Sequence, residues 1–342
     1  MKGVERVKHK ILIADEYKFI WSGEYTPILV SLGGSWAYGT NNENSDIDVR
    51  GIVMDPIESI LGLSNFEQHE VHDKEKDVDA VLYGLRKMVK LLLGNNPNCI
   101  EILSPQERNI VFSNDIGKEL IERRHLFLSK KAAFTFGAYA KAQLDRLENA
   151  VCHDALSQPK QEEHMLHSIL GMMDHFNDRF QSFEEGSVKL KLVDAINKEY
   201  EKEIVLDVNL HDYPLRDYKS MWSEMNNVVK DYSKLNQRNR KKDIPHLCKH
   251  MMHLVRLLLM GIDLLEKERI ITYREDDLDL LMRIRNGAYM NQDGTVKDSF
   301  YKLVEGIDTR FKSAVSNTKL PEKPNFNEIE KWVMSVCKRY LV

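Results

Sequence analysis

Two short motifs near the N-terminus contain residue types that could perform phosphate chemistry. Gly34-Ser35 follows an apolar run, and Asp46-Ile47-Asp48 follows a polar loop. Successive side chains of a strand point to opposite faces, so Asp46 and Asp48 are expected to share one face. Two carboxylates on one face repel each other unless a cation lies between them. Such oxygen ligands suit Mg²⁺, with Mn²⁺ as the alternative, and a pair of metals supports nucleotide chemistry.

The Gly34-Ser35 turn is expected to bind phosphate. Gly34 allows close backbone approach, and its N–H and that of Ser35 can point at phosphate oxygens. The Ser35 hydroxyl adds a donor. Nucleotidyl transfer depends mostly on positioning and charge neutralisation, which this arrangement would supply. Each motif alone is common in ordinary turns, so the prediction rests on their order: apolar strand, Gly-Ser, short loop, Asp-x-Asp.

The elements that must position these motifs are short strands of one small sheet. Residues 27–32 are apolar and β-branched, which predicts a buried strand running into the glycine turn. Further expected elements are a covering helix within residues 1–20, strands at 46–54, 77–83 and 100–103, and a helix at 84–93 ended by residues 94–97.

Beyond about Asn114 most segments show helical periodicity. We therefore expect an α+β chain in which a mixed sheet with helices is followed by a mostly helical domain. Residues 1–115 would form the nucleotidyltransferase domain, and residues 116–342 would contribute the acceptor or nucleotide cleft. The clearest expected helices are 130–149, 164–183, 218–235, 244–269, 276–285 and 327–340, with an exposed charged connector at 236–243.

Composition sets broad limits on the class of protein. The chain has 342 residues and a formal net charge of −4, which neither demands nor excludes nucleic acid. The four cysteines are far apart and match no zinc or redox spacing. We find neither a signal peptide nor a membrane span, so the expected location is the cytoplasm, or the host cytoplasm for a phage protein. The oligomeric state is not indicated.

The combination of motifs resembles the DNA polymerase β-like nucleotidyltransferase superfamily, whose hallmark is Gly-Ser followed after a short gap by Asp-x-Asp. More narrowly, the chain resembles a predicted nucleotidyltransferase family often found near RNA ligases, which phages and bacteria both carry. This family usually has one residue between the glycine and the proline of a later motif. This chain has two, Asn95 and Asn96, so the motif is one residue longer here. The segments that carry the resemblance are 34–39, 45–51, 94–103, 249–257, 273–274 and 284–287.

The superfamily resemblance implies a third acid on a neighbouring strand, which serves as metal ligand and general base. Asp77 and Asp79 share a face, and Asp79 is favoured because it directly precedes the apolar run. Glu101, just after the Asn-Pro turn, is another candidate or an ordinary cap. Arg50 shares the face of the acidic pair and could hold a nucleotide phosphate or form a structural ion pair.

A basic stripe is expected on the helix predicted at 244–269. Lys249, His253 and Arg256 recur at helical spacing and could attract a triphosphate or an RNA backbone. The alternatives are a helix that packs on the first domain and, less favoured, a zinc site that also uses the neighbouring histidines. Arg274 and Arg285 are weaker companions of the stripe.

These observations predict Mg²⁺-dependent transfer of a nucleoside monophosphate from an NTP to an acceptor hydroxyl. Asp46 and Asp48 would hold both metals, Asp79 would hold the catalytic one, and Gly34 and Ser35 would bind the phosphates. The resemblance implies RNA as the acceptor, with a tRNA end under repair as one candidate. Nucleotidylation of a protein or small molecule is the enzymatic alternative. A catalytically idle nucleotide- or RNA-binding protein is the alternative of another class.

Overall fold

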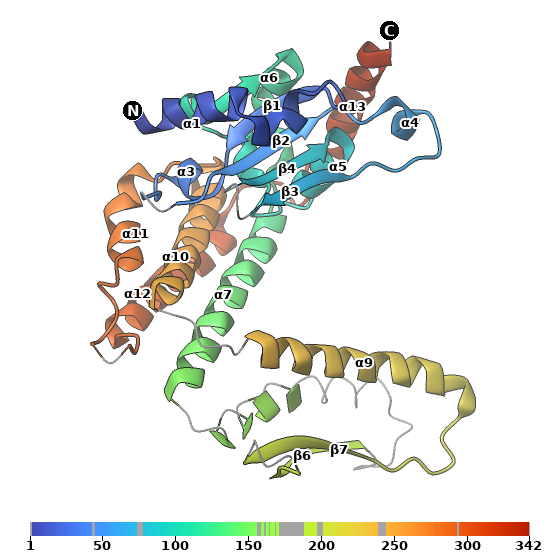
Figure 1. Cartoon of the computed structure of the whole chain (residues 1–342), viewed down its shortest axis with the longest axis vertical. Coiled ribbons are helices and arrows are strands. Elements are labelled where there is room, and N and C mark those ends of the chain that lie inside the picture. Colours follow the sequence, from blue (N-terminus) through green and yellow to red (C-terminus); the bar gives the residue numbers. More distant parts are fainter. Residues whose placement is uncertain are drawn as a thin grey trace. The chain divides into compact units, whose positions relative to one another are not determined.

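The computed structural model of the chain is shown in Figure 1. It describes residues 2–42, 45–73, 78–155, 159–160, 162–163, 165–167, 169–170, 188–196, 201–238, 244–292 and 294–341. The chain forms two compact units. Unit 1 comprises 1–143, 251–291 and 297–342, and unit 2 comprises 144–250 and 292–296. The predicted domain boundary near residue 115 falls inside unit 1.

A five-stranded mixed sheet is the centre of unit 1. Its order is β3-β4-β2-β1-β5. The pair β2–β4 is parallel, and the other neighbours are antiparallel. The strands are β1 (Pro27–Leu32), β2 (Asp48–Val53), β3 (Gln68–Asp73), β4 (Val78–Gly84) and β5 (Ile110–Ser113). This mixed sheet, with a mostly helical C-terminal region, confirms the predicted α+β class.

Apolar residues explain why the sheet forms where it does. Five of the six residues of β1 are buried, as expected for a strand with neighbours on both sides. Buried side chains of β1, β2 and β4 form one core with the N-terminal segment, including Ile11 of α1 (Lys2–Ile13) and Ile20 of α2 (Lys18–Trp21). The predicted covering helix is therefore confirmed, as two helices with a 3₁₀ turn at Asp15–Tyr17 between them.

The other helices of unit 1 agree in part with the predicted ones, whereas the helices at 34–38, 57–60, 115–122 and 298–317 were not predicted individually. The predicted helix at 84–93 is α5 (Leu85–Leu93), and α3 (Gly34–Tyr38) is a single turn after β1. The remaining helices are α4 (Ile57–Ile60), α6 (Asp115–Glu122), α11 (Leu278–Arg285), α12 (Asp298–Asn317) and α13 (Phe326–Leu341), with α7 (Lys131–Ala155) and α10 (Ile244–Lys267) contributing residues to both units.

Two expected strands are corrected by the structure. Residues 100–103 form a 3₁₀ helix, Ile100–Leu103, because the preceding turn continues: the N–H of Ile100 donates to Asn96 O at 2.9 Å. The second strand begins at Asp48 and not at Asp46, so Asp46 lies in the loop before it.

The stretched turn before that 3₁₀ helix is tightly held. Asn95 has a positive φ of 50° and is buried. Its side-chain amide donates to Phe127 O at 2.6 Å and accepts from the Ser129 hydroxyl at 2.9 Å. The extra residue relative to the family pattern is thus accommodated by internal hydrogen bonds, since asparagine tolerates the left-handed conformation better than most residues.

Unit 2 has its own small core. An antiparallel hairpin of β6 (Val188–Asp194) and β7 (Lys202–Val208) was not predicted. Met221, Met225 and Val228 of α9 (Leu215–Arg238) form a buried cluster with Ile169 and Val188. Most of the predicted helix at 164–183 lies outside the described residues, as do residues 239–243 of the connector predicted at 236–243, whose first three residues belong to α9. None of the described helices is long and apolar enough to cross a membrane.

Candidate functional site

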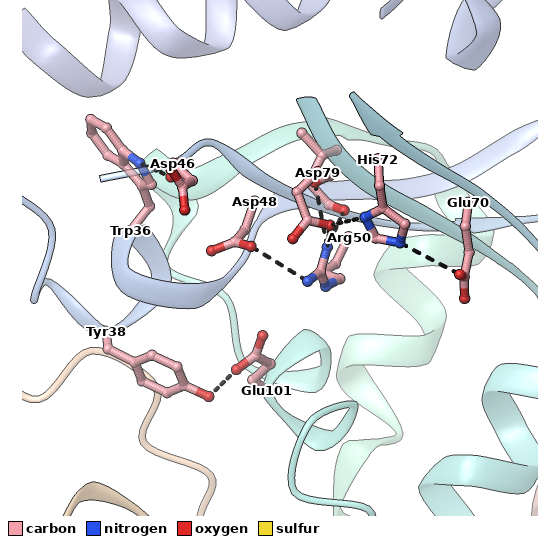
Figure 2. Close-up of polar contacts among 10 residues, drawn as sticks. Trp36, Tyr38, Asp46, Asp48, Arg50, Glu70, His72, Asp79 and Glu101 are labelled. Atoms are coloured by element: carbon pink, nitrogen blue, oxygen red, sulfur yellow. Dashed lines mark hydrogen bonds and ion pairs between the residues drawn. The ribbon is translucent and has the colours of Figure 1, made fainter. Parts of the chain in front are cut away.

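Two carboxylates meet on neighbouring strands of the sheet. Asp48 opens β2, and the parallel register places it directly opposite Asp79 of β4. Arg50 lies between them: its Nη2 is 3.5 Å from Asp48 Oδ1, and its Nη1 is 3.3 Å from Asp79 Oδ1. Figure 2 shows the three side chains side by side. The guanidinium offsets the repulsion that two such carboxylates would otherwise have.

A histidine extends this row of charges. His72 of β3 is the antiparallel partner of Asp79, and its Nδ1 lies 3.1 Å from Asp79 Oδ1. Its Nε2 lies 3.5 Å from Glu70 Oε2, so Asp79, His72 and Glu70 form a chain across the two strands (Figure 2). Sequence reasoning missed His72, and the signal that could have found it is the hairpin register of the polar strand at 68–73.

Asp46 is separate from this pair. It is exposed in the loop before β2, and its backbone C=O accepts a hydrogen bond from the Trp36 indole at 3.1 Å. Arg285 of α11 holds the same loop, donating to Thr40 O and, at 3.2 Å, to the Ser45 hydroxyl. Burial lowers the pKa of Arg285, and the nearby charge of Asp46 acts in the opposite direction. Arg285 therefore positions the acidic loop.

The glycine turn lies directly against Asp48. Gly34 has a φ of 53°, and a Cβ built there would be 1.8 Å from Asp48 Oδ2. The N–H of Gly33 donates to Asp48 O at 2.9 Å. Both the left-handed backbone and the lack of space require glycine at position 34. The two predicted motifs thus belong to one site.

Glu101 is buried beneath the turn, with 8% of its surface exposed. It accepts hydrogen bonds from the backbone N–H of Gly34 and from the Tyr38 hydroxyl (Figure 2). Burial raises the pKa of Glu101 to about 7, against the opposing charge of Arg256. The Gly34 N–H, predicted to face phosphate, is therefore engaged by a carboxylate, which leaves Ser35 as the donor residue of the turn.

Arg256 faces the same cluster from α10. It is 7% exposed, and its Cζ lies 3.7 Å from the centre of the Tyr38 ring. Burial lowers the pKa of Arg256 to about 10, and the charge of Glu101 counteracts this. Cation–π contact and a buried carboxylate hold Arg256 under the turn. It supports the turn from within the protein instead of forming part of an exposed basic stripe.

The other members of the predicted stripe differ from Arg256. Lys249 is exposed and belongs to unit 2, whereas His253 is half-buried in unit 1. Within the described part of the chain, no three His, Cys, Asp or Glu side chains are placed to hold a metal ion as they stand. This applies to the histidines of α10, predicted as a less favoured zinc site, and to the three predicted carboxylates. Asp77, the alternative third acid, lies outside the described residues.

Residues 273–274 brace the end of the turn. Gly39 has a φ of 77°, and a Cβ there would be 2.3 Å from the Tyr273 ring, which Arg108 covers at 4.3 Å. The backbone N–H of Arg274 donates to Tyr38 O at 3.4 Å. The buried Arg274 guanidinium contacts Asp263 and Asp277, so it forms a structural ion-pair network.

Part of the chain is similar to a known protein family. Residues 18–176, just under half of the chain, match the model of a family described as the RNA repair pathway DNA polymerase beta family. No curated protein matches the chain. A nucleotidyltransferase-like protein from Exiguobacterium sibiricum 255-15 is 11% identical, with 90% of this chain and 75% of that chain covered, at a TM-score of 0.26 that carries no argument. The family match supports a nucleotidyltransferase of the polymerase β type for the matched part of the chain.

Proposed function

We propose that this chain is a polymerase β-like nucleotidyltransferase that transfers a nucleoside monophosphate from an NTP to a hydroxyl of RNA, with Mg²⁺ as its metal. The observation that carries the proposal is the convergence of Asp48 and Asp79 beside the Gly34-Ser35 turn. RNA as the acceptor is supported by the RNA-repair description of the matching family.

The donor set fits Mg²⁺ in its chemistry. Asp48 and Asp79 present oxygen ligands on adjacent strands, and the missing Cβ of Gly34 leaves room beside Asp48. Asp46, Asp48 and Asp79 would hold the metal, and the loop held by Arg285 is the part that must bring Asp46 to the pair. When bound, Mg²⁺ supplies charge neutralisation for the attacking and leaving oxygens.

Different residues of the chain would orient the phosphates and accept the proton. The acceptor oxygen forms a bond to the α-phosphorus, the bond from this phosphorus to the bridging oxygen breaks, and pyrophosphate leaves. The N–H and hydroxyl of Ser35 would orient the leaving phosphates. Asp79 would accept the proton of the acceptor hydroxyl, and His72, 3.1 Å away, would keep its carboxylate oriented.

The experiment uses the position of the radiolabel to identify the reaction. Wild-type protein is incubated with Mg²⁺, total RNA and each NTP carrying the label on either the α- or the γ-phosphate. We expect transfer of the α-label alone to RNA. Transfer of the γ-label would indicate a kinase, α-label on protein would indicate protein nucleotidylation, and no transfer would favour the idle binding protein.

Matched Asp→Asn variants test the site. Asp48→Asn and Asp79→Asn should each lower the rate of α-label transfer by about 10²–10⁴-fold, as for loss of a ligand or general base. Asp115→Asn, at an exposed carboxylate in the first turn of α6, should leave the rate unchanged. Full activity in both site variants, with unaltered melting temperatures, would contradict the proposed site.

A further inference from the structure

A groove lies next to the carboxylates and has no part in the chemistry described above. It encloses about 1010 Å³ between α1 and the segments that carry Trp36, Ser45 and Ile47. The last two residues flank Asp46 directly. Ligand pockets for drug-sized molecules measure about 300–1,000 Å³, so this groove lies at the upper end of that range.

One wall of the groove offers a fixed aromatic ring. Trp36 is half-buried, and its indole N–H is tied to Asp46 O at 3.1 Å, which orients the ring and links it to the acidic loop (Figure 2). Ile13 of α1 lines the same groove with 61% of its surface exposed. Such a surface accepts the flat face of a nucleobase, and stacking tolerates any base.

The other wall carries an arginine and a histidine side chain. Arg6 and His9, three residues apart on α1, are exposed and line the groove. The acidic residues at its end are neutralised by ion pairs: Asp15 with Lys18 at 2.6 Å and Glu16 with Lys10 at 3.3 Å. Among the described residues, Arg6 has no acidic partner, so its charge is available to a ligand.

We propose that this groove binds the single-stranded end of the polynucleotide acceptor. A base stacks beside Trp36, and the adjoining phosphates contact Arg6 and His9. An aromatic ring combined with positive charge along the backbone path is the arrangement that binds single-stranded nucleic acid without sequence preference. The end of the strand then lies beside the loop that carries Asp46. This inference rests on the proposed function and names the acceptor's binding site.

The test measures binding of a short fluorescein-labelled single-stranded RNA to the full chain by anisotropy, without NTP. Trp36→Ala should weaken binding by about five- to 150-fold, the range expected for loss of one stacked base. Trp36→Phe also loses the hydrogen bond to Asp46 but keeps a ring, so it should retain most of the affinity. This comparison separates stacking from support of the acidic loop.

A pair of charge variants on one helix tests the phosphate contact. Arg6→Gln should weaken binding and reduce the slope of log K against log salt by about 0.7, the value for one phosphate contact on a single strand. Lys8→Gln removes the same charge from α1 at a position outside the groove and should change neither quantity.

The outcomes separate this inference from the proposed function. If the Arg6→Gln and Trp36→Ala variants bind RNA with the affinity of the wild-type protein, the groove assignment is overturned. It is also overturned if the wild-type protein does not bind RNA. RNA binding that depends on both residues, without α-label transfer to RNA, would support the groove and contradict the proposed function. Melting temperatures of all variants identify any that fail to fold.

Discussion

At the scale of single residues, Glu101 is a buried carboxylate that supports the site from below the glycine turn. It joins Gly34, Tyr38 and Arg256 from three separate parts of the chain, in a place where water is excluded. A buried carboxylate is costly unless hydrogen bonds and opposite charge offset the burial, and here two hydrogen bonds and the nearby charge of Arg256 do so. We therefore regard Glu101 as a positioning residue of the glycine turn and not as the third metal ligand.

The raised pKa of Glu101 predicts a pH dependence of stability. Its pKa is about 7 in the folded protein and near 4.5 without burial, so the folded state favours the protonated form. The resulting stabilisation is fully present below pH 4.5 and is lost as the pH rises through 7. Its size is on the order of 3 kcal/mol. The side chain of the Glu101→Gln variant cannot titrate. In urea unfolding measured from pH 5 to 8, this variant should therefore show a smaller change of the free energy of unfolding with pH than the wild-type protein.

An exposed carboxylate provides the control for this measurement. Glu305→Gln on the surface of α12 should leave the slope of the wild-type profile unchanged. If Glu101→Gln keeps the wild-type slope, another group is responsible for it. In that case burial would not raise the pKa of Glu101.

At the scale of elements, the turn between β1 and α3 brings the two motifs together. Gly34→Ala places a methyl group 1.8 Å from Asp48 Oδ2 and also forces a positive φ on alanine. We expect a loss of about 1–3 kcal/mol of stability from the backbone alone. We also expect near-complete loss of α-label transfer, because the turn and Asp48 must move apart. Thermal unfolding and the labelling assay measure the two effects.

A second glycine makes the comparison specific. Gly306 lies within α12, and a Cβ built there would have no neighbour within 4 Å. Gly306→Ala should raise stability by about 0.5–1 kcal/mol, since alanine favours the helix, and leave labelling unchanged. Full activity of Gly34→Ala would show that the turn tolerates displacement from Asp48. The turn would then not be part of the active site.

The sequence was sufficient for the elements with strong local signals. The apolar run at 27–32 and the Asp-x-Asp motif identified β1, β2 and the turn between them. The strand β3 was missed because its residues at 68–73 are polar and partly exposed, so no apolar alternation marks them. Spacing alone predicted Arg256 as part of a phosphate-binding stripe, with a helix packed on the first domain as the alternative. Its burial depends on Tyr38 and Glu101, which are distant in sequence, and periodicity cannot report such contacts.

At the scale of the whole molecule, the compact units are not continuous stretches of the sequence. Unit 1 contains residues from both sides of unit 2 in the sequence. The site residues Tyr38, Glu101 and Arg256 all lie in unit 1, although Arg256 follows the other two by more than a hundred positions. Local sequence patterns cannot predict that the chain re-enters unit 1 after unit 2, because long-range packing of apolar faces decides which segments form one unit.

Separate cores predict separate stability. Met225 is 7% exposed in the cluster of unit 2, whereas the core around β1, β2 and β4 consists of other residues. Met225→Ala should cost about 2–5 kcal/mol locally, as for other buried methionines. Hydrogen exchange should therefore accelerate in β6, β7 and α9 and stay at the wild-type rate in β1, β2 and β4. Equal acceleration in all six elements would show that the two cores unfold as one cooperative unit, and the site would then depend on unit 2 for its stability.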